Sequence, residues 1–327
     1  MARLIKEEHV RELLTMADAL VAVEQAFKAV ALGEAVNVPR HRGALKGATV
    51  NSMGAISSAL DLMAMKVYPI VRQDITVGSS FQVLVWRIST GALVGVLEAE
   101  LLAQIRTGAA SGVATRLMAR ADSRVMTLFG AGWQAHAQLD AIARVLPGLE
   151  RVNVIGRSAQ RVTEFCAAMA VQLEGHCAAR LVPATDIECA VRESDVVTTI
   201  TGSQVPLFDG QWLAAGVHLN AAGSNFAQKQ EIDSSTVQRS ARIVADDVEV
   251  AKLESGDLIA AAAAGALDWS RVRSLADVVG GTFPGRASAD EITLFESQGL
   301  GLEDLAVAAV LLAESERRGI GLDIPLQ

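Results

Sequence analysis

The first part of the chain combines one amphipathic helix with several short strands. Apolar residues recur at helical spacing from Thr15, a capping residue, to Gly33, and they predict a helix over this range. Four segments of β-strand character follow, at residues 48–53, 60–68, 81–88 and 93–97. A helix joined to closely spaced strands predicts an α+β unit with an antiparallel or mixed sheet.

Beyond a helical stretch at 101–119, the pattern changes to apolar runs that alternate with helical segments. The runs lie at residues 125–129, 152–155, 179–182, 196–200, 217–222 and 243–245. Continuous apolar strands separated by crossovers predict a parallel sheet covered on both faces, and these six fit a doubly wound Rossmann fold. A further β-like run at 292–295 precedes a last helix at 302–318.

Length, composition and charge narrow the class of protein. A chain of 327 residues favours two domains, and 51% hydrophobic residues indicate a globular α/β protein. The net charge of −8, with scattered lysines and arginines, lacks the basic footprint of a nucleic-acid binder. No apolar run approaches the roughly 18 residues that span a bilayer, and the amino terminus lacks a signal-peptide stretch. Three cysteines without a CxxC pair indicate no metal site, so we expect a cytoplasmic protein without metal, membrane or nucleic acid.

The strand at 125–129 runs directly into a turn that fits the pattern G-x-G-x-x-A. The turn consists of Gly130, Ala131, Gly132, Trp133, Gln134 and Ala135. The first glycine permits a tight turn, the second lets the backbone approach a pyrophosphate, and the alanine allows close packing of helix and strand. A helix that begins near Trp133 directs its free N–H groups at the phosphates. We therefore predict a dinucleotide site; the alternative is a glycine turn that binds no nucleotide.

The residues after the second parallel strand discriminate between NAD and NADP. NAD enzymes usually place Asp or Glu there to accept from the ribose 2′-OH, but this chain has Gly156, Arg157 and Ser158. Arg157 and Ser158 can bind a 2′-phosphate that a carboxylate would repel, which favours NADP(H) over NAD(H). The alternative for Arg157 is a solvated residue at a helix start. Near the end of a later strand, Ala222 and Gly223 lie where the switch-point rule places the nicotinamide.

Several motifs follow one another in order along nearly the whole chain. They are Met53 ahead of Lys66, the stretch 105–111, the glycine-rich turn, and the stretches 218–225, 231–233, 292–299 and 303–305. In this order they resemble the ornithine cyclodeaminase/mu-crystallin family. The resemblance implies an α/β homodimer with an α+β substrate-binding and dimerisation domain built from both chain ends, residues 1–118 with 302–327. The Rossmann NAD(P)-binding domain would span residues 119–301.

The resemblance also implies a substrate site. Carried over position by position, Arg40, Lys66 and Arg106 hold the carboxylate of a small amino, imino or keto acid near the nicotinamide, and Thr107 contacts cofactor phosphate. The catalytic residues would be Lys66, Arg106 and Asn225. A small anion removed from water needs such cations, and Lys66, inside an apolar stretch, can donate a proton to the substrate.

Each of the three cations has an alternative that involves no substrate. Arg40 would be a loop charge, Lys66 would extend to solvent along its apolar stem, and Arg106 would pair with Glu98 or Glu100. A site for a small anion nevertheless agrees with the family assignment, because an arginine fork matches a carboxylate at two points.

The chain departs from the family pattern near the expected substrate. Cyclodeaminases of the family place an aspartate where this sequence has Asn225, and an amide cannot act as a general base. Gly54 stands where a proline is expected, Arg87 takes a usually acidic position, and the pocket loop at 71–80 differs. We therefore predict NAD(P)H-dependent reduction of a small 2-imino (ketimine) or 2-keto acid by hydride transfer. The alternatives are an ornithine cyclodeaminase, which converts L-ornithine to L-proline and ammonia, and a non-catalytic protein that binds NADPH and a ligand.

Overall fold

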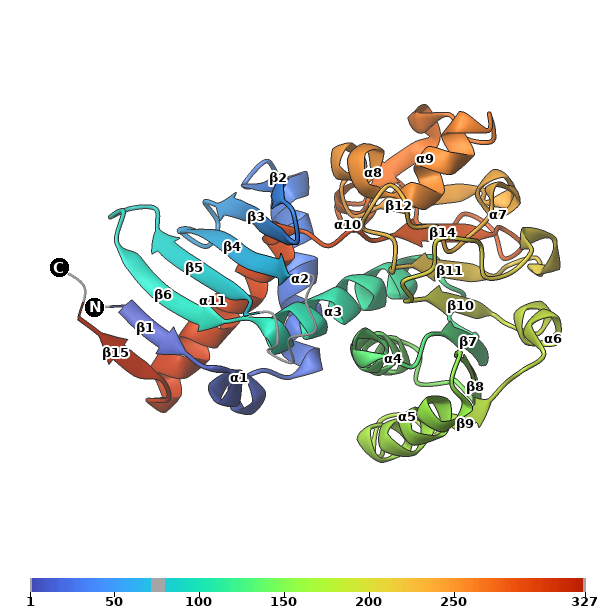
Figure 1. The fold of residues 1–327 in the computed structure, drawn as a ribbon, viewed down its shortest axis with the longest axis horizontal. Helices are drawn as coiled ribbons and strands as arrows, with labels where there is room; N and C mark the ends of the chain where they lie inside the picture. Colours follow the sequence, from blue (N-terminus) through green and yellow to red (C-terminus); the bar gives the residue numbers. More distant parts are fainter. Residues whose placement is uncertain (1, 72–79, 326–327) are drawn as a thin grey trace. The chain divides into compact units, whose positions relative to one another are not determined.

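The computed structural model describes residues 2–71 and 80–325, so the pocket loop predicted at 71–80 lies almost wholly outside the described residues. The chain forms two compact units, Met1–Arg106 with Leu300–Gln327, and Thr107–Gly299 (Figure 1). The division falls inside α3 (Glu100–Met118), whose first residues belong to the first unit and whose remainder belongs to the second. The predicted domain limit at 118/119 lies at the carboxyl end of α3, and the one at 301/302 lies two residues beyond the division before α11. The roles given to the two domains stay predictions.

The first unit is built on a seven-stranded mixed sheet in the order β15-β1-β6-β5-β4-β3-β2. Its strands are β1 (Ala2–Ile5), β2 (Ala35–Leu45), β3 (Ala48–Ser57), β4 (Leu62–Val71), β5 (Gln82–Arg87), β6 (Leu93–Glu98) and β15 (Leu322–Ile324). β1 runs parallel to β6, and the other neighbouring strands pair antiparallel. The predicted α+β unit with a mixed sheet is confirmed.

One face of this sheet is covered by the last long helix. The helices of the unit are α1 (Glu7–Leu13), α2 (Met16–Ala31) and α11 (Gly301–Arg318). α11 lies against the sheet, and α2 packs on α11. Two glycines permit the close approach: a Cβ on Gly95 would be 2.8 Å from the Leu312 side chain, and a Cβ on Gly301 would be 2.4 Å from the carbonyl O of Gly54. The start of α11 therefore sits directly on β3.

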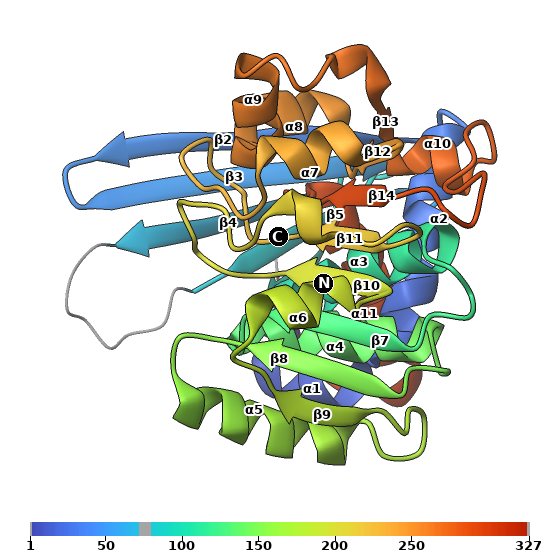
Figure 2. The same cartoon turned by 90° about the vertical axis from the view of Figure 1, so that its right-hand side faces the viewer.

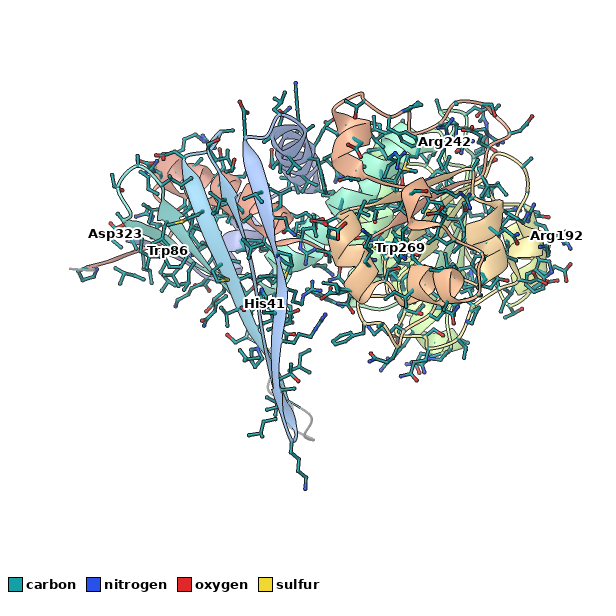
Figure 3. The ribbon with its side chains drawn as sticks, turned by 90° about the horizontal axis from the view of Figure 1, so that it is seen from above. His41, Trp86, Arg192, Arg242, Trp269 and Asp323 are labelled. Carbon is teal, nitrogen blue, oxygen red and sulfur yellow. The ribbon has the colours of Figure 1, made fainter. Side chains whose placement is uncertain are left out.

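The edge strand β2, which forms a long hairpin with β3 (Figure 2), does not follow from the apolar pattern. All of its residues are exposed or half-buried, and its middle carries charged and polar side chains, so the sequence lacks the alternation of apolar and polar residues typical of a half-buried strand. The structure places Arg40 in this strand, at a β-bulge between Val38 and His41; His41 is labelled in Figure 3. The alternative that Arg40 is a loop charge is therefore wrong.

The second unit contains an eight-stranded parallel sheet in the order β13-β12-β14-β11-β10-β7-β8-β9, with β9 and β13 at opposite edges (Figure 2). Its strands are β7 (Val125–Phe129), β8 (Arg151–Ile155), β9 (Arg180–Pro183), β10 (Val196–Thr199), β11 (His218–Ala221), β12 (Arg242–Ala245), β13 (Val272–Ser274) and β14 (Thr293–Glu296). All six predicted parallel strands are present, and β14 matches the β-like run at 292–295. β13 was not predicted, because three residues give no periodic signal.

Two apolar clusters form the core of this Rossmann sheet. Its helices are α4 (Trp133–Val145), α5 (Ala159–Gln172), α6 (Ile187–Arg192), α7 (Ser234–Arg239), α8 (Val248–Glu254), α9 (Gly256–Ala263) and α10 (Leu275–Val279). One cluster joins α4 and α5 to β7 and β8, and the other joins α7, α8 and α9 to β10, β11 and β12. The predicted doubly wound fold is confirmed. Within residues 2–71 and 80–325, no helix is both long and apolar enough to span a bilayer.

Candidate functional site

The two glycines of the turn between β7 and α4 have different surroundings. Gly130 has a φ of +117°, a backbone conformation that residues with a side chain rarely adopt. A Cβ there would also lie 2.6 Å from the carbonyl O of Ile200. Its N–H donates to the carbonyl O of Ile155 at 2.8 Å. At Gly132, by contrast, a Cβ would meet no atom of the described residues within 4 Å, apart from its two chain neighbours. Gly130 is thus required by the turn itself, whereas Gly132 borders open space at the start of α4.

The start of α4 fits a dinucleotide phosphate. Gly132 is the N-cap residue and offers no side chain to the first N–H groups of the helix, where the positive end of the helix dipole lies. Gln134 Oε1 is buried and has no hydrogen-bond partner among the described residues. Thr107 is buried nearby in α3, and its carbonyl O accepts from Gln138 Nε2 of α4 at 3.2 Å. The backbone donors and the open space together suit the phosphates of a nicotinamide dinucleotide.

The end of β8 lies beside the same turn. A Cβ on Gly156 would be 3.8 Å from the Cβ of Ala131, so the two loops are in contact. Arg157 is exposed, and Ser158 caps α5, its Oγ accepting from the N–H of Arg161 at 3.4 Å. Residues 156–158 carry no carboxylate, so the 2′-phosphate of a bound NADP would meet no negatively charged side chain in this segment.

The loop after β11 is held by a carboxylate to which the sequence analysis gave no role. Glu231 Oε2 accepts from the N–H of Gly223 at 2.8 Å and from Thr199 Oγ1 at 2.9 Å. Its Oε1 accepts from both the N–H and the Oγ1 of Thr201 at 2.6 Å. Burial raises the pKa of Glu231, and these hydrogen bonds oppose the shift. Glu231 therefore ties the loops after β10 and β11 together at the edge where the Rossmann fold binds its cofactor.

Gly223 is needed for this contact, since a Cβ would lie 2.3 Å from the carbonyl O of Thr201 and 2.5 Å from Glu231 Oε2. In the same loop, Asn225 Oδ1 accepts from Lys229 Nζ at 3.2 Å. That ammonium also lies 5.5 Å from the ring centroid of Phe226. Cofactor contacts of Ala222 and Gly223, and a catalytic role of Asn225, stay predictions.

Four ionic side chains from three distant segments meet in the first unit. We call Lys66, Arg106, Glu303 and Asp304 the Lys66 cluster. Asp304 Oδ1 accepts from Lys66 Nζ at 3.0 Å and from Arg106 Nε at 3.0 Å. Arg106 Nη1 donates to Glu303 Oε2 at 2.8 Å. The Lys66 side chain is 3% exposed and that of Asp304 1%, so this is an ionic network withdrawn from water.

The local fold explains why these residues meet. The register of β3 and β4 places Lys66 opposite Met53, on the face of the sheet that α11 covers. The contact of Gly301 with Gly54 seats the first turn of α11 next to this pair of strands. Glu303 and Asp304 belong to that first turn, and Arg106 comes from α3.

Burial and the negative charge of Asp304 shift the pKa of Lys66 in opposite directions. The pKa of its ammonium is lowered to about 8: burial lowers it most, the positive charges of Arg106 and Arg40 lower it further, and Asp304 opposes the shift. The rings of Tyr68 and Phe81, with centroids 5.6 Å and 5.3 Å from Nζ, present faces that favour a cation. The lysine is therefore charged at neutral pH but is a stronger acid than an exposed lysine.

The structure brings together Lys66 and Arg106 and places Arg40 within their electrostatic range. The alternative that Lys66 extends to solvent is wrong, because Asp304 binds it in the interior. The pairing of Arg106 with Glu98 or Glu100 is also wrong, since Arg106 binds Glu303 and Asp304 instead. Among the described residues, no group of three or more His, Cys, Asp and Glu could hold a metal ion.

Known proteins match this chain over nearly its whole length, in sequence and in fold. A model of the ornithine cyclodeaminase/mu-crystallin family matches residues 2–318. The structure of a Delta(1)-pyrroline-2-carboxylate reductase from Thermococcus litoralis, in complex with NADH and L-proline, superimposes with a TM-score of 0.91 at 28% identity and covers 98% of this chain and 100% of its own.

Two further solved structures are similar over nearly their full length. An archaeal alanine dehydrogenase dimer with bound NAD has a TM-score of 0.91 at 30% identity, covering 100% of this chain and 99% of its own. The iminosuccinate reductase of Paracoccus denitrificans, in complex with NAD+, has a TM-score of 0.90 at 26% identity, covering 99% of both chains. The three relatives are thus reductases or dehydrogenases whose structures contain NAD(H).

Proposed function

Because the chain belongs to the ornithine cyclodeaminase/mu-crystallin family, we propose that it reduces a small 2-imino (ketimine) or 2-keto acid with NAD(P)H. The three relatives described above are reductases or dehydrogenases whose structures contain NAD(H), and this chain is an enzyme of that type. The Lys66 cluster is the observation that carries the proposal. It keeps an ammonium and a guanidinium out of water, at two of the positions to which the family resemblance assigns binding of the substrate carboxylate.

The residues of the chain have separate tasks in this reaction. When bound, a reduced nicotinamide supplies a hydride to C2 of the substrate, while the nitrogen or oxygen of the C2 double bond takes one proton. Lys66 donates that proton, because its ammonium is charged at pH 7 and burial has made it more acidic. Arg40 and Arg106 hold the substrate carboxylate. Nε and Nη1 of Arg106 already donate to Asp304 and Glu303, so we assign Nη2 to the substrate.

The cofactor is held by the turn after β7 and by the loops beside it. Backbone groups from Gly130 to Gln134, together with Thr107, bind the phosphates, and Ala222 and Gly223 border the nicotinamide. We propose that NADP(H) is preferred over NAD(H), because Arg157 and Ser158 stand where a carboxylate would reject a 2′-phosphate.

Fluorescence titration with NADPH and NADH tests this preference. Arg157→Asp should lose NADPH affinity on the order of tenfold or more and leave NADH affinity nearly unchanged. Equal affinities of the parent protein for both cofactors, with no effect of the substitution, would contradict the proposed preference.

The enzyme is proposed to work as a homodimer through the sheet face opposite α11. Along β4 and β5, half-buried apolar side chains on that face alternate with buried ones that face α11. They are Met63, Met65, Val67, Leu84 and Trp86, the last labelled in Figure 3. Light scattering should give the mass of two chains for the parent and of one chain for Met65→Lys. Val171→Lys, on an exposed residue of α5, is the matched control and should remain dimeric.

The reaction itself is tested by following nicotinamide absorbance with a panel of cyclic imines, and of 2-keto acids with ammonia or methylamine. Imine-dependent oxidation of NADPH or NADH is the expected result, and Lys66→Met should abolish it while cofactor binding is retained. Formation of proline and ammonia from L-ornithine with NAD would instead identify a cyclodeaminase that works without a carboxylate at Asn225. Cofactor binding without any turnover would contradict the reductase and leave a binding protein.

A further inference from the structure

One carboxylate oxygen in the first unit serves two cations. Asp304 Oδ1 lies 3.0 Å from Lys66 Nζ and 3.0 Å from Arg106 Nε. The other oxygen of this carboxylate, Oδ2, is buried without a hydrogen-bond partner among the described residues. The buried negative charge is therefore stabilised chiefly by Lys66 and Arg106, and in turn it binds both of them to the first turn of α11.

Asp304 stabilises the protonated form of Lys66 against the effects of burial and of two neighbouring positive charges. Arg106 from α3 and Arg40 from β2 repel a proton on Lys66, and burial removes the water that would stabilise the ammonium. The rings of Tyr68 and Phe81 favour the cation only weakly by comparison. Asp304 is the anion in direct contact with the ammonium and acts against both effects.

We propose that Asp304 is a positioning residue, which keeps Lys66 protonated as the proton donor and holds Arg106 in register with it for the substrate carboxylate. The catalytic part of this inference rests on the proposed reductase function. The electrostatic part does not, because it concerns only the contacts within the Lys66 cluster.

Glu303 offers a matched control within the same helix turn. Its carboxylate is buried like that of Asp304 and binds Arg106, whereas the ammonium of Lys66 donates to Asp304. Glu303→Gln and Asp304→Asn each remove one buried negative charge from adjacent positions of α11. They therefore have similar effects on the helix and on Arg106 but differ at Lys66.

The first measurement is independent of activity. Lysine labelled with 13C at Cε gives few signals, because the chain has six lysines, and loss of one signal in Lys66→Met assigns Lys66. A pH titration by NMR should show the pKa of Lys66 falling by about 1–3 units in Asp304→Asn and clearly less in Glu303→Gln. Circular dichroism and NAD(P)H titration verify that each variant is folded.

The second measurement is the pH profile of kcat/KM for imine reduction. A proton donor is active while protonated, so activity declines as pH rises through the pKa of Lys66. Asp304→Asn lowers that pKa, which moves the decline to lower pH and reduces kcat/KM at pH 9 about tenfold or more, while the difference narrows towards pH 5–6. Glu303→Gln should raise KM through Arg106 and move the decline clearly less than Asp304→Asn does.

An unchanged pKa of Lys66 in a folded Asp304→Asn protein overturns the inference. A uniform loss of activity at all pH values, without movement of the decline, also overturns it, because that is the result of a purely structural role. If Asp304→Asn does not fold, Asp304→Glu keeps the charge and moves it by one methylene; unchanged kcat and KM there contradict positioning. A shifted pKa of Lys66 in a protein that reduces no imine supports the electrostatic role and refutes the proposed function instead.

Discussion

The two glycines of the turn after β7 should respond in opposite ways to the addition of one methyl group. At Gly130 the obstacle is the fold itself, through a φ of +117° and the carbonyl O of Ile200 at 2.6 Å from a Cβ. At Gly132 the φ of −96° suits any residue, and beyond the adjoining residues no atom in the described part of the chain lies within 4 Å of a Cβ. In the dinucleotide-binding pattern, a bound pyrophosphate would occupy the space beside Gly132.

The expected magnitudes follow from these surroundings. For Gly130→Ala, the unfavourable φ costs about 1–3 kcal/mol, and relief of the clash with Ile200 costs about 1–3 kcal/mol more. The melting temperature should therefore fall by several degrees, at roughly 2–4 °C for each kcal/mol. Gly132→Ala should leave stability unchanged or raise it by about 0.4–1 kcal/mol. Its affinity for NAD(P)H should nevertheless fall on the order of tenfold or more, about 1.4 kcal/mol.

Calorimetry without cofactor and fluorescence titration with NADPH and NADH separate the two effects. Cofactor should also raise the melting temperature of the parent more than that of Gly132→Ala, because stabilisation by a ligand depends on its affinity. If Gly132→Ala bound NAD(P)H as tightly as the parent protein does, the turn would not be a dinucleotide-binding site. The alternative of a glycine turn that binds no nucleotide would then hold. If Gly130→Ala melted at the same temperature as the parent protein, the φ of Gly130 and its contact with Ile200 would not be what requires a glycine there.

Three other outcomes are expected. Asn225→Asp restores the family's carboxylate and should introduce or raise conversion of L-ornithine to proline, measured together with ammonia. Burial raises the pKa of Asp257 to about 7, so the folded protein binds this proton more tightly than the unfolded chain does. Stability should fall as pH rises from about 4 through 7, and the melting temperature of Asp257→Asn should depend less on pH, because burial also raises the pKa values of Glu231 and Glu296. Gly301→Ala meets the backbone of Gly54 and should destabilise the protein by about 1–3 kcal/mol, whereas Gly95→Ala meets a movable leucine side chain and should cost less in urea unfolding.

The parallel sheet could be predicted from the sequence because each of its longer strands is a continuous apolar run. β7 was predicted to the residue, since its run ends at a glycine that must turn the chain. β2 has the opposite character: it lies at a sheet edge, it is polar, and its pairing with β3 is a tertiary property. The family resemblance, which rested on several motifs in order, is confirmed over residues 2–318.

The charged site was only partly predictable. Lys66 and Arg106 were found by resemblance, and their burial agrees with it. Glu303 and Asp304 lay inside a noted motif, yet nothing local reveals their partners, because Asp304 is 238 residues from Lys66 and 198 from Arg106. Their roles appear only when α11 docks on β3. The bond between Glu231 and Gly223 likewise required the arrangement of two loops.

The Lys66 cluster contains residues from the early part of the chain and from its last helix, so it can form only when α11 packs on the first unit. A buried ammonium or guanidinium without a partner costs several kcal/mol, and so does an unpaired buried carboxylate. Lys66 and Arg106 belong to the first third of the chain, whereas Glu303 and Asp304 belong to its last helix. During synthesis from the amino terminus, the contiguous segment 107–299 is available to fold before α11 exists. Because α11 covers the sheet of the first unit and β15 pairs with β1, we expect the charged site to form in the step in which α11 packs on the sheet.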